Sequence, residues 1–397
     1  MNTLQLRILT AGSLARLATE GAGLAMVVLS IERTGSAATA GVLLACATLP
    51  QLVTGPLVGA ALDRAQRPGP ILGGAVAASA VAVGALAVDR SLGLMAVGAA
   101  LVTSVTQPAL TGGLSATFGR LAVRPSDAPT MASWDAVAYN VAGLGGPALV
   151  TVVTAWTGGT AATWVLAVTI AIALPAVVGP WPRRDTARRR SRSATLRAAA
   201  HLMAARPELR SVTITTSVAF LGVGGLTIAA AAAARGAGRD GTDAGPIVPA
   251  IAIGALAGSI AWTRRPAAGD PARPVIGATV ATGFVLIVMG AGAWPVAIAG
   301  AVVVGVLDAP VLIATFASRH AGSPLELRSS VFTVGASLKL AASSVGALVA
   351  GWTLGRAVTG VGLVVIGAVH VLSAALGWVA LRRRREEHDG AVRRPTR

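Results

Sequence analysis

The chain has 397 residues, of which 54% are hydrophobic and only 12% are charged, and its formal net charge is +17. A soluble domain carries roughly a quarter charged residues, so this composition excludes an ordinary soluble protein and favours helices that face lipid. The apolar runs are continuous, which excludes the alternating pattern of an outer-membrane β-barrel. The basic residues fall between these runs, which makes them topogenic signals rather than a nucleic-acid surface.

The hydropathy pattern predicts twelve membrane-spanning helices, because each apolar run is close to the roughly 20 residues that cross a hydrocarbon core. In chain order the runs cover residues 8–31, 38–62, 71–88, 93–117, 129–153, 160–180, 211–234, 245–263, 275–293, 295–318, 329–353 and 357–381. The ninth and tenth runs leave room only for a very tight turn at Trp294-Pro295. We therefore expect an all-α membrane protein.

An Arg-rich segment divides the twelve runs into two sets of six. The predicted organisation is an N-terminal six-helix bundle (1–180), a basic cytoplasmic linker (181–210), a C-terminal six-helix bundle (211–381) and a basic cytoplasmic tail (382–397). Thr117-Phe118 and Thr315-Phe316 stand at corresponding places in the two halves, and each pair leads through a proline and an acidic residue into an apolar helix. This repeat indicates two pseudo-symmetric halves.

The linker contains a short apolar pattern at helical spacing. Leu196, Ala199 and Met203 recur on one face, and Arg197 and Arg206 lie opposite. Two interpretations stay open: a short amphipathic helix on the inner membrane surface, or a flexible basic linker.

The basic residues also predict the orientation. With both termini in the cytoplasm, most of the 33 Lys and Arg residues lie on the cytoplasmic side, as the positive-inside rule requires. Tryptophans fall near the predicted helix ends, where an amphipathic ring is favoured; these are Trp134, Trp156, Trp181, Trp262, Trp294, Trp352 and Trp378. We expect a multi-pass protein of the plasma (inner) membrane.

The loop after the second run carries the most specific motif. Residues 59–67 read Gly-Ala-Ala-Leu-Asp-Arg-Ala-Gln-Arg: a glycine, three residues, an aspartate and two basic residues. This resembles the loop signature of the major facilitator superfamily of secondary transporters, although Gln66 stands in place of a second glycine and Pro68 in place of a basic residue. The resemblance implies a gating loop made of Gly59, Asp63, Arg64 and Arg67. It also implies that Asp63 lies at a helix N-terminus near Ser329-Ser330, where an anion is favoured.

A second motif lies in the fifth run, where residues 140–147 read Asn-Val-Ala-Gly-Leu-Gly-Gly-Pro. It resembles the Gly-Pro signature of the drug-, macrolide- and siderophore-exporting branch of the same superfamily. The trailing Gly-Gly of the antiporter pattern is absent. The resemblance implies that Gly143, Gly146 and Pro147 allow the helix to bend and pack closely.

Four charged residues are predicted near the middle of the membrane, where a charge costs at least ~3 kcal/mol. Arg16 and Glu20 share one face of the first helix, and Asp308 and Lys339 lie at similar depth in the tenth and eleventh. In one interpretation Glu20 or Asp308 carries a proton and Arg16 or Lys339 is its charge partner. In the other the four residues form static ion pairs.

Five polar residues within the runs are candidates to line a cavity: Gln51, Gln107, Asn140, Thr215 and Ser337. Each of them could instead form a hydrogen bond to a neighbouring helix, and the two roles are not separated by the sequence.

Enzyme chemistry is not expected. Cys46 is the only cysteine, the histidines are scattered, and the sequence has neither a nucleophile elbow nor an ATP-binding loop. We therefore expect no metal and no cofactor.

The expected function is proton-coupled efflux of a small amphipathic molecule by an alternating-access antiporter. Its partners would be the small-molecule substrate, protons and the lipid bilayer, with no nucleic acid, and we expect a monomer. Two alternatives remain: uptake of a nutrient or metabolite, and a non-transporting membrane sensor on the same fold.

Overall fold

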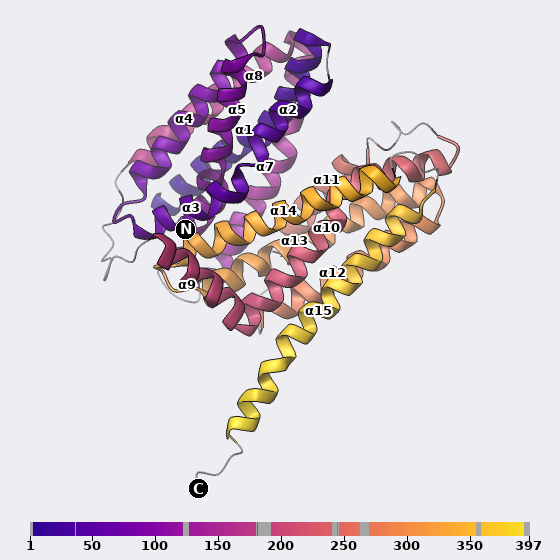
Figure 1. The fold of residues 1–397 in the computed structure, drawn as a ribbon. Coiled ribbons are helices and arrows are strands. Elements are labelled where there is room, and N and C mark those ends of the chain that lie inside the picture. The colour runs from indigo at the N-terminus through magenta and orange to yellow at the C-terminus, as the bar shows by residue number, and fades with distance from the viewer. Residues whose placement is uncertain are drawn as a thin grey trace. The chain divides into compact units, whose positions relative to one another are not determined.

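The computed structural model describes residues 3–35, 37–121, 127–179, 181, 192–239, 244, 246–262, 270–354 and 359–392, and for 37–38, 128–129, 192–194 and 383–392 the backbone alone. The long regular elements of these residues are all helices (Figure 1). In chain order they are α1 (Thr3–Thr34), α2 (Ala37–Thr48), α3 (Gln51–Arg64), α4 (Gly69–Val88), α5 (Leu94–Pro108), the π-helix η1 (Ala109–Gly113), α6 (Leu114–Gly119), α7 (Ala128–Thr157), α8 (Gly159–Val178), α9 (Arg192–Ala205), α10 (Pro207–Gly236), α11 (Ile247–Trp262), α12 (Ala272–Ala291), α13 (Trp294–Gly322), α14 (Arg328–Leu354) and α15 (Val361–Val392).

Within the described residues, eleven helical stretches are long and apolar enough to cross a membrane. Their mean hydropathy runs from 1.4 to 2.4 and none is shorter than 20 residues. The eighth predicted run corresponds to α11, which has 16 residues and is therefore shorter than the roughly 20 that cross a bilayer. The chain is a multi-pass all-α membrane protein.

Two of the predicted runs are interrupted. The run 38–62 divides at Leu49-Pro50 into α2 and α3, and the run 93–117 divides into α5, η1 and α6. The tight turn predicted at Trp294-Pro295 is present, since α12 ends at Ala291 and α13 begins at Trp294. In the linker, residues 192–205 form the helix α9, and residues 182–191 lie outside the described part of the chain.

The interruption at Pro108 has a local compensation. Proline has no N–H, so Pro108 cannot bond to the carbonyl oxygen of Ser104, four residues earlier in α5. The hydroxyl of Thr54 on α3 donates a hydrogen bond to that oxygen at 3.2 Å. A backbone acceptor that would otherwise be unsatisfied in an apolar environment therefore joins α3 to α5.

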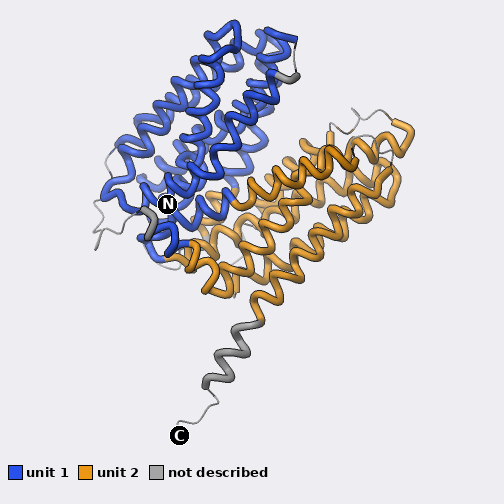
Figure 2. Tube along the Cα trace, viewed as in Figure 1, with its two compact units in different colours: residues 1–127, 137–199, 324–337 blue, residues 128–136, 200–323, 338–397 orange. Residues whose placement is uncertain are grey.

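The residues group into two compact units, drawn in blue and orange in Figure 2. Unit 1 comprises residues 1–127, 137–199 and 324–337, and unit 2 comprises 128–136, 200–323 and 338–397. The grouping follows the two halves of the sequence except at two helix starts. The first residues of α7 group with unit 2, and the first residues of α14 group with unit 1.

Two neighbouring charged residues at the end of α1 cap two other helices of unit 1. The Glu32 carboxylate accepts the N–H of Gly159 at 2.9 and 3.1 Å, at the start of α8. Arg33 donates to the carbonyl oxygens of Leu86 at 2.8 Å and Asp89 at 2.6 Å, at the end of α4. An anion at a helix N-terminus and a cation at a C-terminus each oppose the helix dipole, so this pair stabilises one end of unit 1.

Close packing of glycines on backbone holds helices of unit 2 together. A Cβ atom on Gly305 of α13 would collide with the backbone of Ile251 and Ala255 on α11, and one on Gly254 of α11 would collide with the backbone of Val302 on α13. Small residues of this kind let helices approach closely in a membrane. Close packing matters there because the hydrophobic effect does little to bring two helices together in lipid.

Candidate functional site

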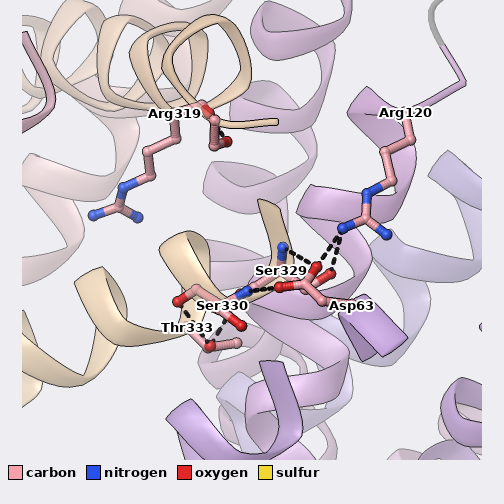
Figure 3. Close-up of polar contacts among 7 residues, drawn as sticks. Asp63, Arg120, Arg319, Ser329, Ser330 and Thr333 are labelled. Carbon is pink, nitrogen blue, oxygen red and sulfur yellow. Dashed lines mark hydrogen bonds and ion pairs between the residues drawn. The ribbon is translucent and has the colours of Figure 1, made fainter. Parts of the chain in front are cut away.

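Asp63, next to the last residue of α3, binds the first turn of α14 within unit 1. Its carboxylate accepts the backbone N–H of Ser329 at 2.7 Å and that of Ser330 at 2.6 Å (Figure 3). Arg120, which follows α6, donates to the same carboxylate at 2.5 Å and to the Ser329 hydroxyl at 3.1 Å. The structure thus contains the contact that the family resemblance implied, with an arginine added to it.

The physical chemistry of this contact favours a charged carboxylate. The first N–H groups of a helix have no partner within it, and the helix dipole attracts an anion there. The side chains of Asp63 and Arg120 are 0% and 6% exposed, so their ion pair is shielded from water. Burial lowers the pKa of the Arg120 guanidinium and the Asp63 carboxylate opposes this effect. Arginine remains positive across the physiological range.

The contact between α3 and α14 continues along both helices at a spacing of four residues. The paired positions are Gly55 with Ser337, Gly59 with Thr333, and Asp63 with Ser329. We refer to these three pairs as the α3–α14 seam. A Cβ atom on Gly59 would lie 2.8 Å from the Ser329 oxygen and 2.9 Å from the Ser330 Cα, both backbone atoms. The seam therefore joins small residues to hydroxyl residues and ends in the buried ion pair.

The other two basic residues of the predicted gating loop, Arg64 and Arg67, are not among the residues drawn in Figure 3. Arg64 is half-buried and Arg67 is exposed, and neither contributes to the contacts of Asp63 drawn in Figure 3. Arg120 does contribute, and the sequence pattern missed it. In the sequence it is one topogenic arginine among several, and the only signal for it is its place directly after an apolar run.

Arg16 of α1 is 2% exposed and binds the π-helix within unit 1. Its Nε donates to the Leu110 carbonyl oxygen at 3.2 Å, and its Nη2 donates to the Thr111 carbonyl oxygen at 3.2 Å and to Ser115 Oγ at 2.8 Å. Its guanidinium carbon lies 5.7 Å from the ring centre of Tyr139. Carbonyl oxygens have two lone pairs, so those of η1 can accept these bonds in addition to their helical ones.

Glu20 lies one helical turn beyond Arg16, is half-buried and interacts electrostatically with it. The geometry thus gives the two residues different surroundings. Arg16 is held by several acceptors of the neighbouring segment, whereas Glu20 is half-buried and interacts with Arg16 alone among the charged residues that affect it.

In unit 2, the structure brings together the two other membrane charges. Asp308 of α13 is exposed, Lys339 of α14 is half-buried, and the two interact electrostatically. The Lys339 Nζ also lies 4.8 Å from the ring centre of Phe220 on α10. A ring face stabilises an ammonium by its quadrupole, so Lys339 has an aromatic partner as well as an acidic one.

The five polar candidates fall into three groups. Gln51 donates from Nε2 to Gln107 Oε1 at 2.6 Å, and Ser337 Oγ donates to the Gln51 carbonyl oxygen at 3.2 Å, so these three lie together in unit 1. Asn140 on α7 is half-buried. Thr215 on α10 is 0% exposed and packs against Gly377 of α15, which makes it part of a helix contact.

The glycines of the fifth run differ in their surroundings. Gly146 packs against α1, where a Cβ atom would lie 2.6 Å from the Gly21 nitrogen. Gly143 is exposed and a Cβ atom there would meet no atom within 4 Å. Pro147 lies inside α7, which continues as one helix from Ala128 to Thr157.

Comparison of the sequence with models of protein families and with characterised proteins finds no match. Solved structures, in contrast, resemble the whole chain. The human organic anion transporter MFSD10 (TETRAN) has a TM-score of 0.78 at 16% identity, and the match covers 95% of this chain and 100% of that one. A bacterial homologue of the iron transporter ferroportin, in an outward-facing state, has a TM-score of 0.74 at 14% identity. The match covers 96% of this chain and 98% of that one.

The major facilitator superfamily proton:xylose symporter XylE, solved with a bromodeoxyglucose, has a TM-score of 0.70 at 12% identity, and the match covers 95% of each chain. At these identities the shared property is the fold.

Proposed function

We propose that this chain, which has the fold of the major facilitator superfamily, is a secondary active transporter of the plasma (inner) membrane with both termini in the cytoplasm. It would export a small amphipathic molecule in exchange for protons, by alternating access. The fold of the neighbours supports transport in general. Export rests on the Gly-Pro motif of α7, and proton coupling rests on the membrane carboxylates.

The observation that carries the proposal is the α3–α14 seam. It joins a helix of the first sequence half to a helix of the second through a carboxylate that caps a helix and through an ion pair. A permanent helix contact in lipid is made by close packing and does not need a buried ion pair, whose desolvation is costly. The proposed gate opens when this cap breaks and closes when it forms again.

Glu20 and Asp308 are the proposed proton carriers, and Arg16 and Lys339 are their charge partners. Glu20 is half-buried and Asp308 is exposed, and each interacts electrostatically with one basic residue on a membrane helix. Protonation of either carboxylate would remove one charge from its pair, so its interaction with the partner would change as the transporter turns over.

Uptake is the second candidate direction, because one structural neighbour is a proton symporter for xylose. The neighbours differ in what they are said to carry, namely organic anions, iron and xylose. They therefore support the transport class but not one substrate. Accumulation of the substrate in cells with and without an uncoupler separates export from uptake, since an uncoupler raises the cell content of an exported compound and lowers that of an imported one.

The test begins with a thermal-shift screen of the purified protein to find a compound that binds. Substrate-driven pH change is then measured in proteoliposomes with wild type, Glu20→Gln, Asp308→Asn and the matched control Glu208→Gln, which changes an exposed acid. We expect proton coupling to be lost in at least one of the first two variants and kept in the control. Unchanged coupling in both would remove these carboxylates from the mechanism, and binding without any flux would favour a sensor.

A further inference from the structure

The end of the last membrane-spanning stretch in unit 2 carries an aromatic residue and an arginine that contact each other. Trp378 of α15 is 38% exposed, and the guanidinium carbon of Arg382 lies 4.7 Å from the centre of its ring. The two residues are one helical turn apart, at the end of the apolar stretch Val361–Arg382. Tryptophan at such an end is typical of the boundary between lipid and water.

A second arginine reaches the same turn of α15 from the start of α10. The Nη2 of Arg210 donates to the carbonyl oxygen of Ala380 at 2.5 Å. The next residue, Ser211, donates from its hydroxyl to the carbonyl oxygen of Gly377 at 2.8 Å. These two bonds fix the start of α10 against α15. Ala380 lies between Trp378 and Arg382 in the sequence, so Arg210 contacts the same turn as they do.

We propose that Trp378, Arg382 and Arg210 form a binding site for the headgroup of an anionic phospholipid. Arginine presents a planar set of N–H donors that matches a phosphate, and the stacked ring of Trp378 limits the positions that Arg382 can take. The guanidinium of Arg382 lies over the Trp378 ring, and a guanidinium placed over a ring face can donate N–H groups from its edge. The exposed Trp378 ring supplies an apolar surface beside the headgroup for the first carbons of the lipid.

Charge alone does not account for this arrangement. Basic residues that only orient the chain need neither a stacked ring nor a bond to the backbone of a neighbouring helix. General attraction to an anionic surface acts on each nearby Lys or Arg to the same extent, whichever one it is. A specific site instead predicts that Arg382 and Arg210 contribute more to lipid binding than other nearby arginines do. Arg206, which is exposed and lies four residues before Arg210, provides the comparison.

The experiment uses the full chain purified in a neutral detergent. Its apparent Tm is measured with phosphatidylglycerol, with phosphatidylcholine and with soluble glycerol phosphate. The variants are Arg382→Gln, Arg382→Lys, Trp378→Leu and Arg210→Gln, with Arg206→Gln as the matched control. Since the result is the change in Tm on adding lipid to each variant, a variant that is merely less stable remains informative.

We expect phosphatidylglycerol to raise the Tm of wild type and of Arg206→Gln more than phosphatidylcholine does, because a ligand that binds the folded state stabilises it. The lipid-dependent increment should fall by about half or more in Arg382→Gln, Trp378→Leu and Arg210→Gln, and less in Arg382→Lys, which keeps the charge. Equal increments from the two lipids would overturn the proposal. So would an equal loss in Arg206→Gln, which indicates diffuse attraction, or an equal increment from glycerol phosphate, which indicates a site for a soluble phosphate.

Discussion

Gly59 of α3 packs against Thr333 of α14 so closely that any Cβ atom at position 59 would collide with the Thr333 hydroxyl. Four residues earlier, Gly55 lies against Ser337 in the same way, and four residues later Asp63 binds the N–H of Ser329. The spacing of four on each helix keeps all three contacts on one face. The α3–α14 seam thus combines a steric requirement with an electrostatic one.

The steric requirement predicts that Gly59→Ala destabilises the protein. The neighbouring atoms include backbone of α14, which cannot move aside without shifting the helix, so we expect a loss of about 1–3 kcal/mol and a lower apparent Tm. Gly41→Ala on α2 is the control, because position 41 is exposed and a Cβ atom there meets no atom within 4 Å. Equal effects of the two substitutions would show that the seam is not closely packed.

The electrostatic requirement predicts that Asp63→Asn loosens the start of α14. Loss of a charged cap costs about 1–2 kcal/mol, which raises the open population by about 5- to 30-fold. Ser330, which is 0% exposed, can report this as Ser330→Cys in a Cys46→Ser background. Labelling by a maleimide should speed up in Asp63→Asn and stay unchanged in the control Glu208→Gln, which changes an exposed acid of α10. An unchanged rate in both would mean that the cap does not hold α14 closed.

Arg16 should tolerate neither loss of its charge nor loss of its planar shape. Arg16→Gln leaves the π-helix without its bonds and Glu20 without its partner, and we expect it to cost about 1–3 kcal/mol. Arg16→Lys keeps the charge but cannot bond two carbonyls and Ser115 together, so it should fall between wild type and Arg16→Gln. Apparent Tm values check this order, with the exposed Arg67→Gln as control. If the Tm of Arg16→Lys equals that of wild type, the charge of Arg16 alone accounts for its contribution to stability, and the planar shape adds nothing.

The bond from Thr54 to the Ser104 carbonyl should matter only while Pro108 is present. Thr54→Val removes the donor and should cost about 1 kcal/mol in wild type, whereas in a Pro108→Ala background the backbone of residue 108 can bond Ser104 itself. A double-mutant cycle of apparent stabilities measures this coupling. Thr48→Val is the control, since that hydroxyl bonds Leu44 within its own helix at 2.7 Å. Additive effects at positions 54 and 108 would contradict the compensation.

Asp89 should make stability depend on pH in the acid range. Its carboxylate accepts the Ser91 hydroxyl at 2.7 Å and the N–H of Ala96 at 2.9 Å. The Ser91 hydroxyl bond, followed by the backbone bonds, lowers the pKa of Asp89 below its ordinary value, against the opposing effect of burial. The folded state therefore favours the ionised form, which stabilises the protein above the unfolded pKa of about 3.9.

This stability should be lost as the pH falls through the lowered folded pKa. In melts from pH 7 to pH 2.5, the difference in Tm between wild type and Asp89→Asn should be constant at neutral pH and shrink below about pH 4. A difference that stays constant down to pH 2.5 would show that the charge of Asp89 adds nothing to the fold.

The membrane-spanning stretches could be predicted from the sequence because length and hydropathy determine them directly. The contact of Asp63 with Ser329 and Ser330 could be predicted as well, but only through a resemblance to a known motif. Arg120 could not, because its role depends on the end of α6 meeting the end of α3, fifty-seven residues away in the chain.

The binding of Arg16 to η1 is hidden for a different reason. Its partners include the carbonyl oxygens of Leu110 and Thr111, and every residue has such an oxygen, so no residue type marks the place. The sequence could suggest only the nearest charge, Glu20. The burial of Thr215 against Gly377 illustrates the same limit, since a polar residue on a membrane helix can face either an opening or a neighbour.

The π-helix also sets the rotation of everything that follows it. Five residues at positions 109–113 wind one turn more loosely than an α-helix, which amounts to one extra residue in the segment between α5 and α6. If these five residues wound as a regular α-helix instead, the extra residue would turn α6 by about 100° relative to α5. Ser115 would then leave the side that Arg16 occupies, and Arg120 would be carried around the axis away from Asp63. A change in the winding of one turn would thus separate two polar contacts at once, although none of their charged residues had changed.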